Sequence, residues 1–164
     1  MIDVFSLSVE EMASKIKDGQ LTSVEVCEKY IERIDEFEKD VKAWAYFDKK
    51  ILLEKADDAD EHRRSGKSVG PLHGVPVALK DIIGTVDMPT ECGTVIRKGK
   101  SYSQNAEIVE LLHAAGAIVM GKTNTSELAY LGPPKTTNPH DYLRTPGGSS
   151  SGSAASVASL MAPL

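Results

Sequence analysis

Two short apolar runs on either side of an amphipathic helical pattern constrain the fold most strongly. The first run, residues 73–81 (HGVPVALKD), is bounded by Gly and Pro residues and has the length of a β-strand. The second run, residues 117–120 (AIVM), follows a helical pattern over residues 106–115 that Gly116 closes. Because strand, helix and strand alternate along the chain, we expect an α/β fold with parallel strand pairs.

The N-terminal segment carries helical signals instead. Capping boxes at residues 8–11 (SVEE) and 22–25 (TSVE) predict one helix that ends near Gly19 and a longer helix after it. A short apolar patch begins at Trp44, and a charged segment over residues 50–64 predicts a third helix. The longer helix has an apolar stripe near i, i+4 spacing, which we expect to be buried: Val26, Tyr30, Ile34 and Phe37.

Length, charge and cysteine content narrow the class of protein. The 164 residues suffice for one domain, in which we expect a helical layer (residues 1–68) and the start of an α/β core (residues 69–164). A net charge of −5 argues against a general nucleic-acid binder, since neutralising phosphates requires clustered Lys and Arg. Two widely separated cysteines predict reduced thiols. With no secretory signal and no membrane-length apolar run, these features predict a cytoplasmic protein.

Residues 116–123 (GAIVMGKT) match the G-x-x-x-x-G-K-[ST] pattern of a phosphate-binding loop. Such a loop needs backbone N–H groups that are free to wrap a phosphate, whereas here the spacer residues form the predicted strand itself. We therefore interpret Gly116 as a helix cap and residues 121–123 as a strand-to-helix turn. Nucleotide binding that is lost in Lys122→Ala would favour the alternative, a nucleotide-binding module.

Lys80 and the Gly/Ser tract at residues 145–155 (TPGGSSSGSAA) each allow two interpretations. Lys80 ends an apolar run, where desolvation disfavours an ammonium and leaves a neutral amine available as a base. Alternatively, its side chain extends from the strand end to solvent. The tract either brings its backbone close to a substrate or forms a linker or a tightly packed helix. A serine needs an activating base, and no Ser-His-Asp set is apparent among the histidines: His62, His73, His113 and His140.

Metal binding finds little support in the sequence. The acidic segment 57–62 (DDADEH) lacks the Gly and the downstream Glu of a calcium loop, and no pair of histidines has zinc-binding spacing. Cys92 lies in a Gly/Thr-rich loop, and nothing in the sequence pairs it with a base. We expect no metal site.

Three segments in a fixed order resemble the amidase signature enzymes, a family of amide hydrolases that also includes the A subunit of the tRNA-dependent amidotransferase. They are residues 74–81 (GVPVALKD), 116–124 (GAIVMGKTN) and 146–155 (PGGSSSGSAA), with Asn138-Pro139 before the last. The resemblance covers nearly the whole chain, more loosely over its N-terminal helices. It implies an α/β fold in which an N-terminal helical layer precedes the beginning of a mixed-sheet, helix-flanked core.

The resemblance also implies a Ser-cisSer-Lys triad. It assigns the base to Lys80 and the proton-relaying serine, which follows a cis peptide bond, to Ser149. Family members usually have Gly where Ser151 stands. Their nucleophilic serine and oxyanion hole belong to a D-T-G-G-S-type motif beyond Leu164, so we expect the isolated chain to be truncated and inactive. Substrate contacts are expected from the neighbouring residues Gly147, Gly148 and Ser150.

The implied function is hydrolysis of the carbon–nitrogen bond of a small-molecule amide, without a metal or organic cofactor. We expect no direct contact with nucleic acid or membrane, and partners are either further copies of the chain or amidotransferase subunits. One alternative is the A subunit of a glutamyl/aspartyl-tRNA amidotransferase, which copurification with partner subunits would favour. Another is a non-catalytic truncated binding module, which a stop codon after Leu164 in the gene would favour.

Overall fold

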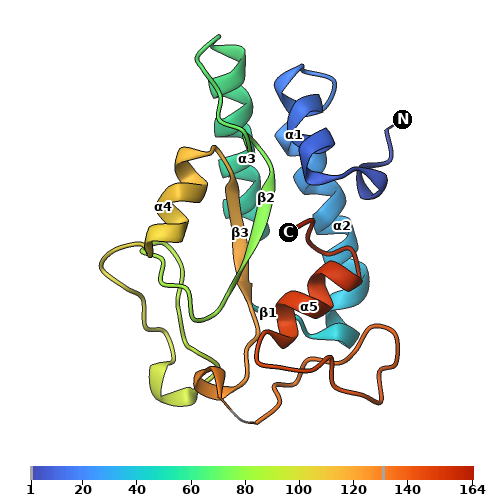
Figure 1. The fold of residues 1–164 in the computed structure, drawn as a ribbon, viewed down its shortest axis with the longest axis vertical. Coiled ribbons are helices and arrows are strands. Elements are labelled where there is room, and N and C mark those ends of the chain that lie inside the picture. Colours follow the sequence, from blue (N-terminus) through green and yellow to red (C-terminus); the bar gives the residue numbers. More distant parts are fainter. Residues whose placement is uncertain (1, 131) are drawn as a thin grey trace.

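A three-stranded mixed sheet runs through the centre of the structure, a computed structural model that describes residues 2–130 and 132–164 (Figure 1). The strands are β1 (Trp44–Phe47), β2 (Pro76–Lys80) and β3 (Ile118–Thr123), in the order β1-β3-β2. Strands β2 and β3 pair in parallel, as the alternation of strands and helices predicts, whereas β1 is antiparallel to β3. The apolar patch at Trp44 is therefore an edge strand contributed by the N-terminal segment.

Five α-helices surround the sheet among the described residues. The predicted capping boxes are present at Ser8 and Thr22, where each side chain accepts from a backbone N–H and a Glu reaches back to the cap. Gly116, with φ of 84°, follows the helix before β3 as expected. The bounds are α1 (Val9–Lys17), α2 (Ser23–Val41), α3 (Lys49–Arg64), α4 (Glu107–Ala114) and α5 (Ser151–Ala158).

Helices cover both faces of the sheet, with α4 on one side and α1, α2 and α5 on the other (Figure 1). The larger core packs α1, α2 and α3 against one face and buries most of the predicted stripe, including Val26, Tyr30 and Ile34, while Phe37 is partly buried. The smaller core includes Leu79, Val109 and Val119 on the α4 side.

A β-bulge in β3 determines which residues face each core. Val77 pairs with Val119 but Ala78 pairs with Gly121, so Met120 is the extra residue. Gly121 is required here because a Cβ would lie 2.6 Å from the Tyr46 carbonyl oxygen.

Beyond the bulge, β3 continues to Thr123, so the expected strand-to-helix turn at residues 121–123 is wrong. The pairs that follow are Leu79 with Lys122 and Lys80 with Thr123. The N–H groups of this segment lie within a strand with partners on both sides, which leaves no backbone cradle for a phosphate.

Neither a membrane span nor a metal cluster is found within the described ranges. None of the helices there is long and apolar enough to cross a membrane. The same residues contain no group of three His, Cys, Asp or Glu side chains placed to hold a metal ion. The acidic segment 57–62 belongs to α3 instead, where Asp60 is buried and accepts from the N–H groups of Ser23 and Val24.

Candidate active site

Lys80 and Ser149 meet at the point where β2 ends. The Lys80 amine donates to Ser149 Oγ at 2.6 Å, although the two residues are 69 positions apart. Lys80 is the last residue of β2, and Ser149 lies two residues before α5 begins. Both side chains are partly buried, so the pair is sheltered by the fold yet open to one side.

Two hydrogen bonds hold the loop that carries Ser149, in which the Gly148–Ser149 peptide bond is cis. The Ser126 N–H donates to the Ser149 carbonyl oxygen at 3.0 Å. The buried Ser151 hydroxyl donates to the Gly147 carbonyl oxygen at 2.5 Å. Gly147 has φ of 90°, a backbone conformation that favours glycine. The two hydrogen bonds hold the backbone of the loop that carries Ser149.

Small residues in α5 allow the helix to lie close to the sheet. The Gly152 N–H donates to the Asn124 carbonyl oxygen at 2.9 Å, and a Cβ on Gly152 would collide with backbone atoms of Ala43 and Asn124. The hydroxyls of Ser153 and Thr123 are 2.6 Å apart. The tract is therefore a tightly packed helix rather than a linker, and this packing brings Ser149 to Lys80.

A cavity of about 510 Å³ opens beside Ser149. Of the predicted substrate-contacting residues, Gly147 and Gly148 line it together with Ser149, and Ser126 lies on its wall. Ser150 does not line this cavity: it is an exposed residue at the N-cap of α5, and its side chain makes no capping hydrogen bond. Of the predicted substrate-contacting residues, Ser150 is therefore the one that does not line the cavity beside Ser149.

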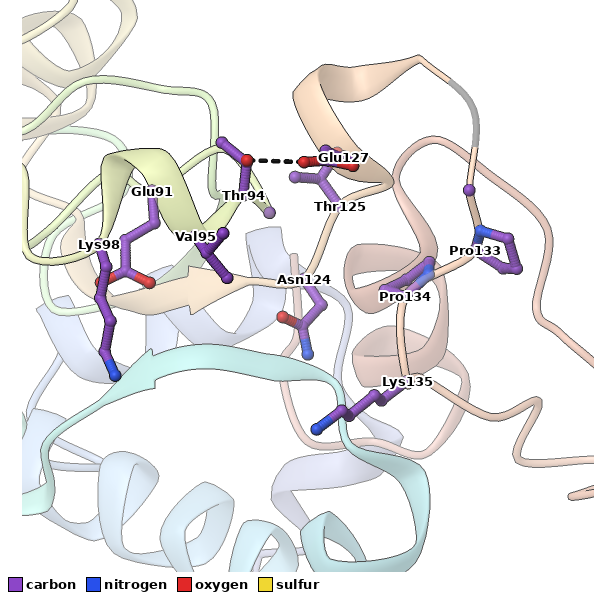
Figure 2. Close-up of a pocket in the computed structure, with 12 residues that line it drawn as sticks. Glu91, Thr94, Val95, Lys98, Asn124, Thr125, Glu127, Pro133, Pro134 and Lys135 are labelled. Carbon is purple, nitrogen blue, oxygen red and sulfur yellow. Dashed lines mark hydrogen bonds between the residues drawn. The ribbon is translucent and has the colours of Figure 1, made fainter.

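A second pocket of about 500 Å³ adjoins this cavity and shares Gly132 and Pro133 with it (Figure 2). It contains neither Lys80 nor Ser149. Figure 2 shows Glu127 opposite Thr94, whose hydroxyl donates to the carboxylate at 2.6 Å. Its charged lining is balanced between two acids and two bases: Glu91, Glu127, Lys98 and Lys135.

A buried acid and a buried base lie behind the pair: Asp81 follows Lys80 in the chain, and Lys122 lies on the other face of the sheet. Burial raises the pKa of Asp81, although N–H groups of Glu91 and Gly93 and the charge of Lys122 oppose the rise. Burial lowers the pKa of Lys122 from 10.5 to about 8, against the opposing attraction of Asp81. Cys92 is tied into the same loop, since its N–H donates to the Asp81 carbonyl oxygen at 2.9 Å.

The sequence patterns did not predict three residues in and around this site. Ser126 and Ser151 hold the Ser149 loop through contacts that have no local sequence signature. Lys122 was assigned to a turn, yet it is the largest fully buried side chain among the described residues. Its position in a run of apolar residues, GAIVMGK, was the signal that could have marked it as interior.

The fold and this pair define the class of protein: a mixed α/β protein with a lysine–serine site between a strand end and a helix N-terminus. A family model described as Amidase matches residues 25–164. The chain therefore belongs to the amidase family, and the resemblance drawn from its three motifs is confirmed.

Curated relatives and solved structures agree with this assignment. The A subunit of the glutamyl-tRNA(Gln) amidotransferase of Streptomyces coelicolor is 40% identical over 172 aligned positions, which cover 100% of this chain and 34% of the relative. The native peptide amidase of Stenotrophomonas maltophilia superposes with a TM-score of 0.88 at 33% identity, over 96% of this chain and 35% of that one. A fatty acid amide hydrolase superposes with a TM-score of 0.90 at 28% identity, over 98% of this chain and 29% of that one. The chain thus spans about a third of the length of these proteins.

Proposed function

We propose that this protein hydrolyses carboxamides, with Lys80 and Ser149 as its proton-transfer residues. The observation that carries this proposal is the 2.6 Å hydrogen bond from the Lys80 amine to Ser149 Oγ beside an open cavity. A lone serine is a poor acid–base group, whereas a serine that is hydrogen-bonded to an amine can pass a proton through its hydroxyl. Membership of the amidase family supports the same chemistry.

In this mechanism Ser149 relays the proton between a nucleophilic serine and Lys80. Neutral Lys80 takes the Ser149 hydroxyl proton while Ser149 Oγ takes the proton of the attacking serine, which we place outside residues 1–164. The attacking oxygen then bonds to the amide carbon. As the carbon–nitrogen bond breaks, the Lys80 ammonium returns its proton through Ser149 to the leaving nitrogen. Water then attacks the acyl carbon while its proton passes through Ser149 to Lys80. The Lys80 ammonium returns a proton through Ser149 to the oxygen of the departing serine, which restores the starting state.

A fusion protein tests this proposal. We would join residues 1–164 to the C-terminal two thirds of the peptide amidase named above and measure ammonia release from a panel of primary carboxamides. We expect release by the fusion and none by residues 1–164 alone, since this proposal takes the nucleophilic serine from the joined segment. A folded fusion that cleaves no carboxamide would contradict the proposal, as would Lys80-dependent hydrolysis by the isolated chain.

A role in a tRNA-dependent amidotransferase, as its A subunit, is the second candidate, favoured by the 40% identity to a protein with that name. Partner subunits would then be required for full function. Affinity purification of the tagged protein from its own cells distinguishes the two functions. Stoichiometric partner subunits favour the transferase, whereas amide hydrolysis by the protein alone favours the hydrolase. A cytoplasmic location is part of both proposals, and the free thiols of Cys27 and Cys92 are consistent with a reducing compartment.

A further inference from the structure

We propose that Lys122 is a positioning residue for Lys80: its buried amine holds the turn after Lys80 and thereby keeps the Lys80 side chain on Ser149. The inference rests on the proposed catalytic role of Lys80. Lys122 lies on β3 opposite Leu79, on the sheet face away from Ser149. Its side chain is 0% exposed, so it acts through the protein interior and not by contact with a substrate.

Two short hydrogen bonds connect Lys122 to the turn. Its amine donates to the Ile83 carbonyl oxygen and to Thr90 Oγ1, both at 2.6 Å. The Ile83 N–H in turn donates to the Lys80 carbonyl oxygen at 3.0 Å, and the Ile82 N–H donates to the same oxygen at 2.8 Å. Lys122 is therefore linked to the Lys80 backbone through a single intervening residue, Ile83.

Asp81 provides a second connection between Lys122 and the segment after Lys80. The buried Asp81 carboxylate accepts from the N–H groups of Glu91 at 3.0 Å and Gly93 at 3.3 Å, and it attracts the Lys122 charge. The Asp81 N–H donates to the Thr123 carbonyl oxygen at 2.9 Å, which extends the sheet ladder past Lys80. Lys122 and Asp81 thus hold the turn at residues 81–83 and the returning segment at residues 90–93.

The cost of burying a lysine argues for a specific role of its amine. A methionine or leucine would fill this position, beside Leu79 in the smaller core, without desolvating a charge. Burial does disfavour the charged form of Lys122, whose pKa is lowered to about 8. What an apolar side chain cannot supply is the pair of donors to Ile83 and Thr90.

Lysine side-chain NMR of the full 164-residue chain tests the proposal without relying on catalysis. With ¹⁵N-labelled lysine, the Lys80 amine signal is identified by its loss in Lys80→Met and by its shift in Ser149→Ala. In Lys122→Met we expect the Lys80 signal to move to the position that it has in Ser149→Ala. Thr90→Val removes one acceptor of Lys122 and should cause a smaller shift in the same direction.

A matched control separates positioning from general loss of packing. Val109→Ala trims a buried residue of the same core without removing a hydrogen bond to the turn, and it should leave the Lys80 signal unchanged. In Lys122→Ala, added propylammonium should restore the wild-type Lys80 signal, whereas propanol of similar size should not. A side chain that only fills space would be replaced equally well by both.

Each outcome decides the inference. An unchanged Lys80 signal in folded Lys122→Met overturns it, as does equal rescue by propanol. If Lys122→Met does not fold, an unchanged signal in Thr90→Val overturns it. In the fusion, Lys122→Met should lower kcat by up to about 100-fold and leave KM unchanged, as expected for a misplaced catalytic group. A fusion without any activity would contradict the proposed function, while the NMR result would still judge the role of Lys122.

Discussion

Lys80 and Lys122 lie one register position apart on neighbouring parallel strands, yet their surroundings differ completely. Lys80 pairs with Thr123, and its amine reaches Ser149 at the partly open end of the sheet. Lys122 pairs with Leu79, and its amine is enclosed on the α4 side. The face of the sheet, rather than the residue type, thus decides which lysine can take part in chemistry.

The bulge at Met120 is the physical cause of this difference. Side chains alternate between the faces of a strand, and one extra residue reverses every later position. Without the bulge, Lys122 would face α5 and Thr123 would face α4. With it, Thr123 contacts Ser153 on the α5 side and Lys122 supports the turn behind Lys80.

Replacement of Lys80 should have the largest effect on activity. We expect Lys80→Met to lower kcat of the fusion by about 1,000-fold, because loss of a general acid–base group costs roughly 10²–10⁴-fold. Thermal unfolding should change little, since the side chain is only partly buried. The comparison between the two lysines fails if Lys122→Met lowers kcat more than Lys80→Met does while the protein remains folded.

Replacement of the relay serine should have the next largest effect. We expect Ser149→Ala to lower kcat by about 100-fold, because the proton then has no hydroxyl through which to reach Lys80. Steady-state ammonia release measures the effect, and Ser150→Ala serves as the control because its exposed side chain does not line the cavity. Equal losses in the two variants would argue against a specific role for Ser149.

Ser151 offers a test of how the relay serine is held. Ser151→Ala removes the 2.5 Å hydrogen bond to the Gly147 carbonyl oxygen, so we expect about 1 kcal/mol lower stability and an activity loss of roughly tenfold. Urea unfolding and kinetics measure the two effects. Ser153→Ala also removes a hydroxyl contact of α5 but not one to the Ser149 loop, so it should affect stability more than turnover.

The pH dependence of stability provides a test that is specific to Lys122. Because the pKa of Lys122 is lowered from 10.5 to about 8, the unfolded chain binds a proton between these pH values that the folded chain has lost. The contribution of Lys122 to the free energy of unfolding therefore rises with pH across this window. Urea unfolding from about pH 7.5 to about pH 10 should show this rise relative to Lys122→Met. Parallel pH profiles for the two proteins would contradict it.

Local patterns predicted much of the fold. The capping boxes and the periodicity of α2 depend on residues within one or two turns of each other, so the sequence alone identified these helices. The pairing of β1 and the extent of β3 depend on distant partners. The sequence patterns did not predict this pairing, and they ended the second strand at Met120, three residues too early. The bulge has no local sequence signature apart from Gly121. A side chain is excluded at Gly121 because Tyr46 of the neighbouring strand lies too close, and the sequence does not show this contact.

The same distinction holds for the site. Family motifs associated Lys80 with Ser149, and the structure places their polar atoms within hydrogen-bond distance. The supporting contacts of Ser126, Ser151 and Lys122 join segments that are far apart or fall within tracts of similar residues. Composition and spacing cannot select among several serines, whereas burial and hydrogen bonding can.

A double-mutant cycle in the fusion tests most directly whether Lys80 and Ser149 act as one proton-transfer unit. The cycle compares kcat/KM for Lys80→Met, Ser149→Ala and the double variant. Residues that act as a unit give strongly non-additive effects. We therefore predict that the double variant is no less active than Lys80→Met alone, at about 1,000-fold below the unmodified fusion. A double variant in which the two losses multiply would contradict the relay.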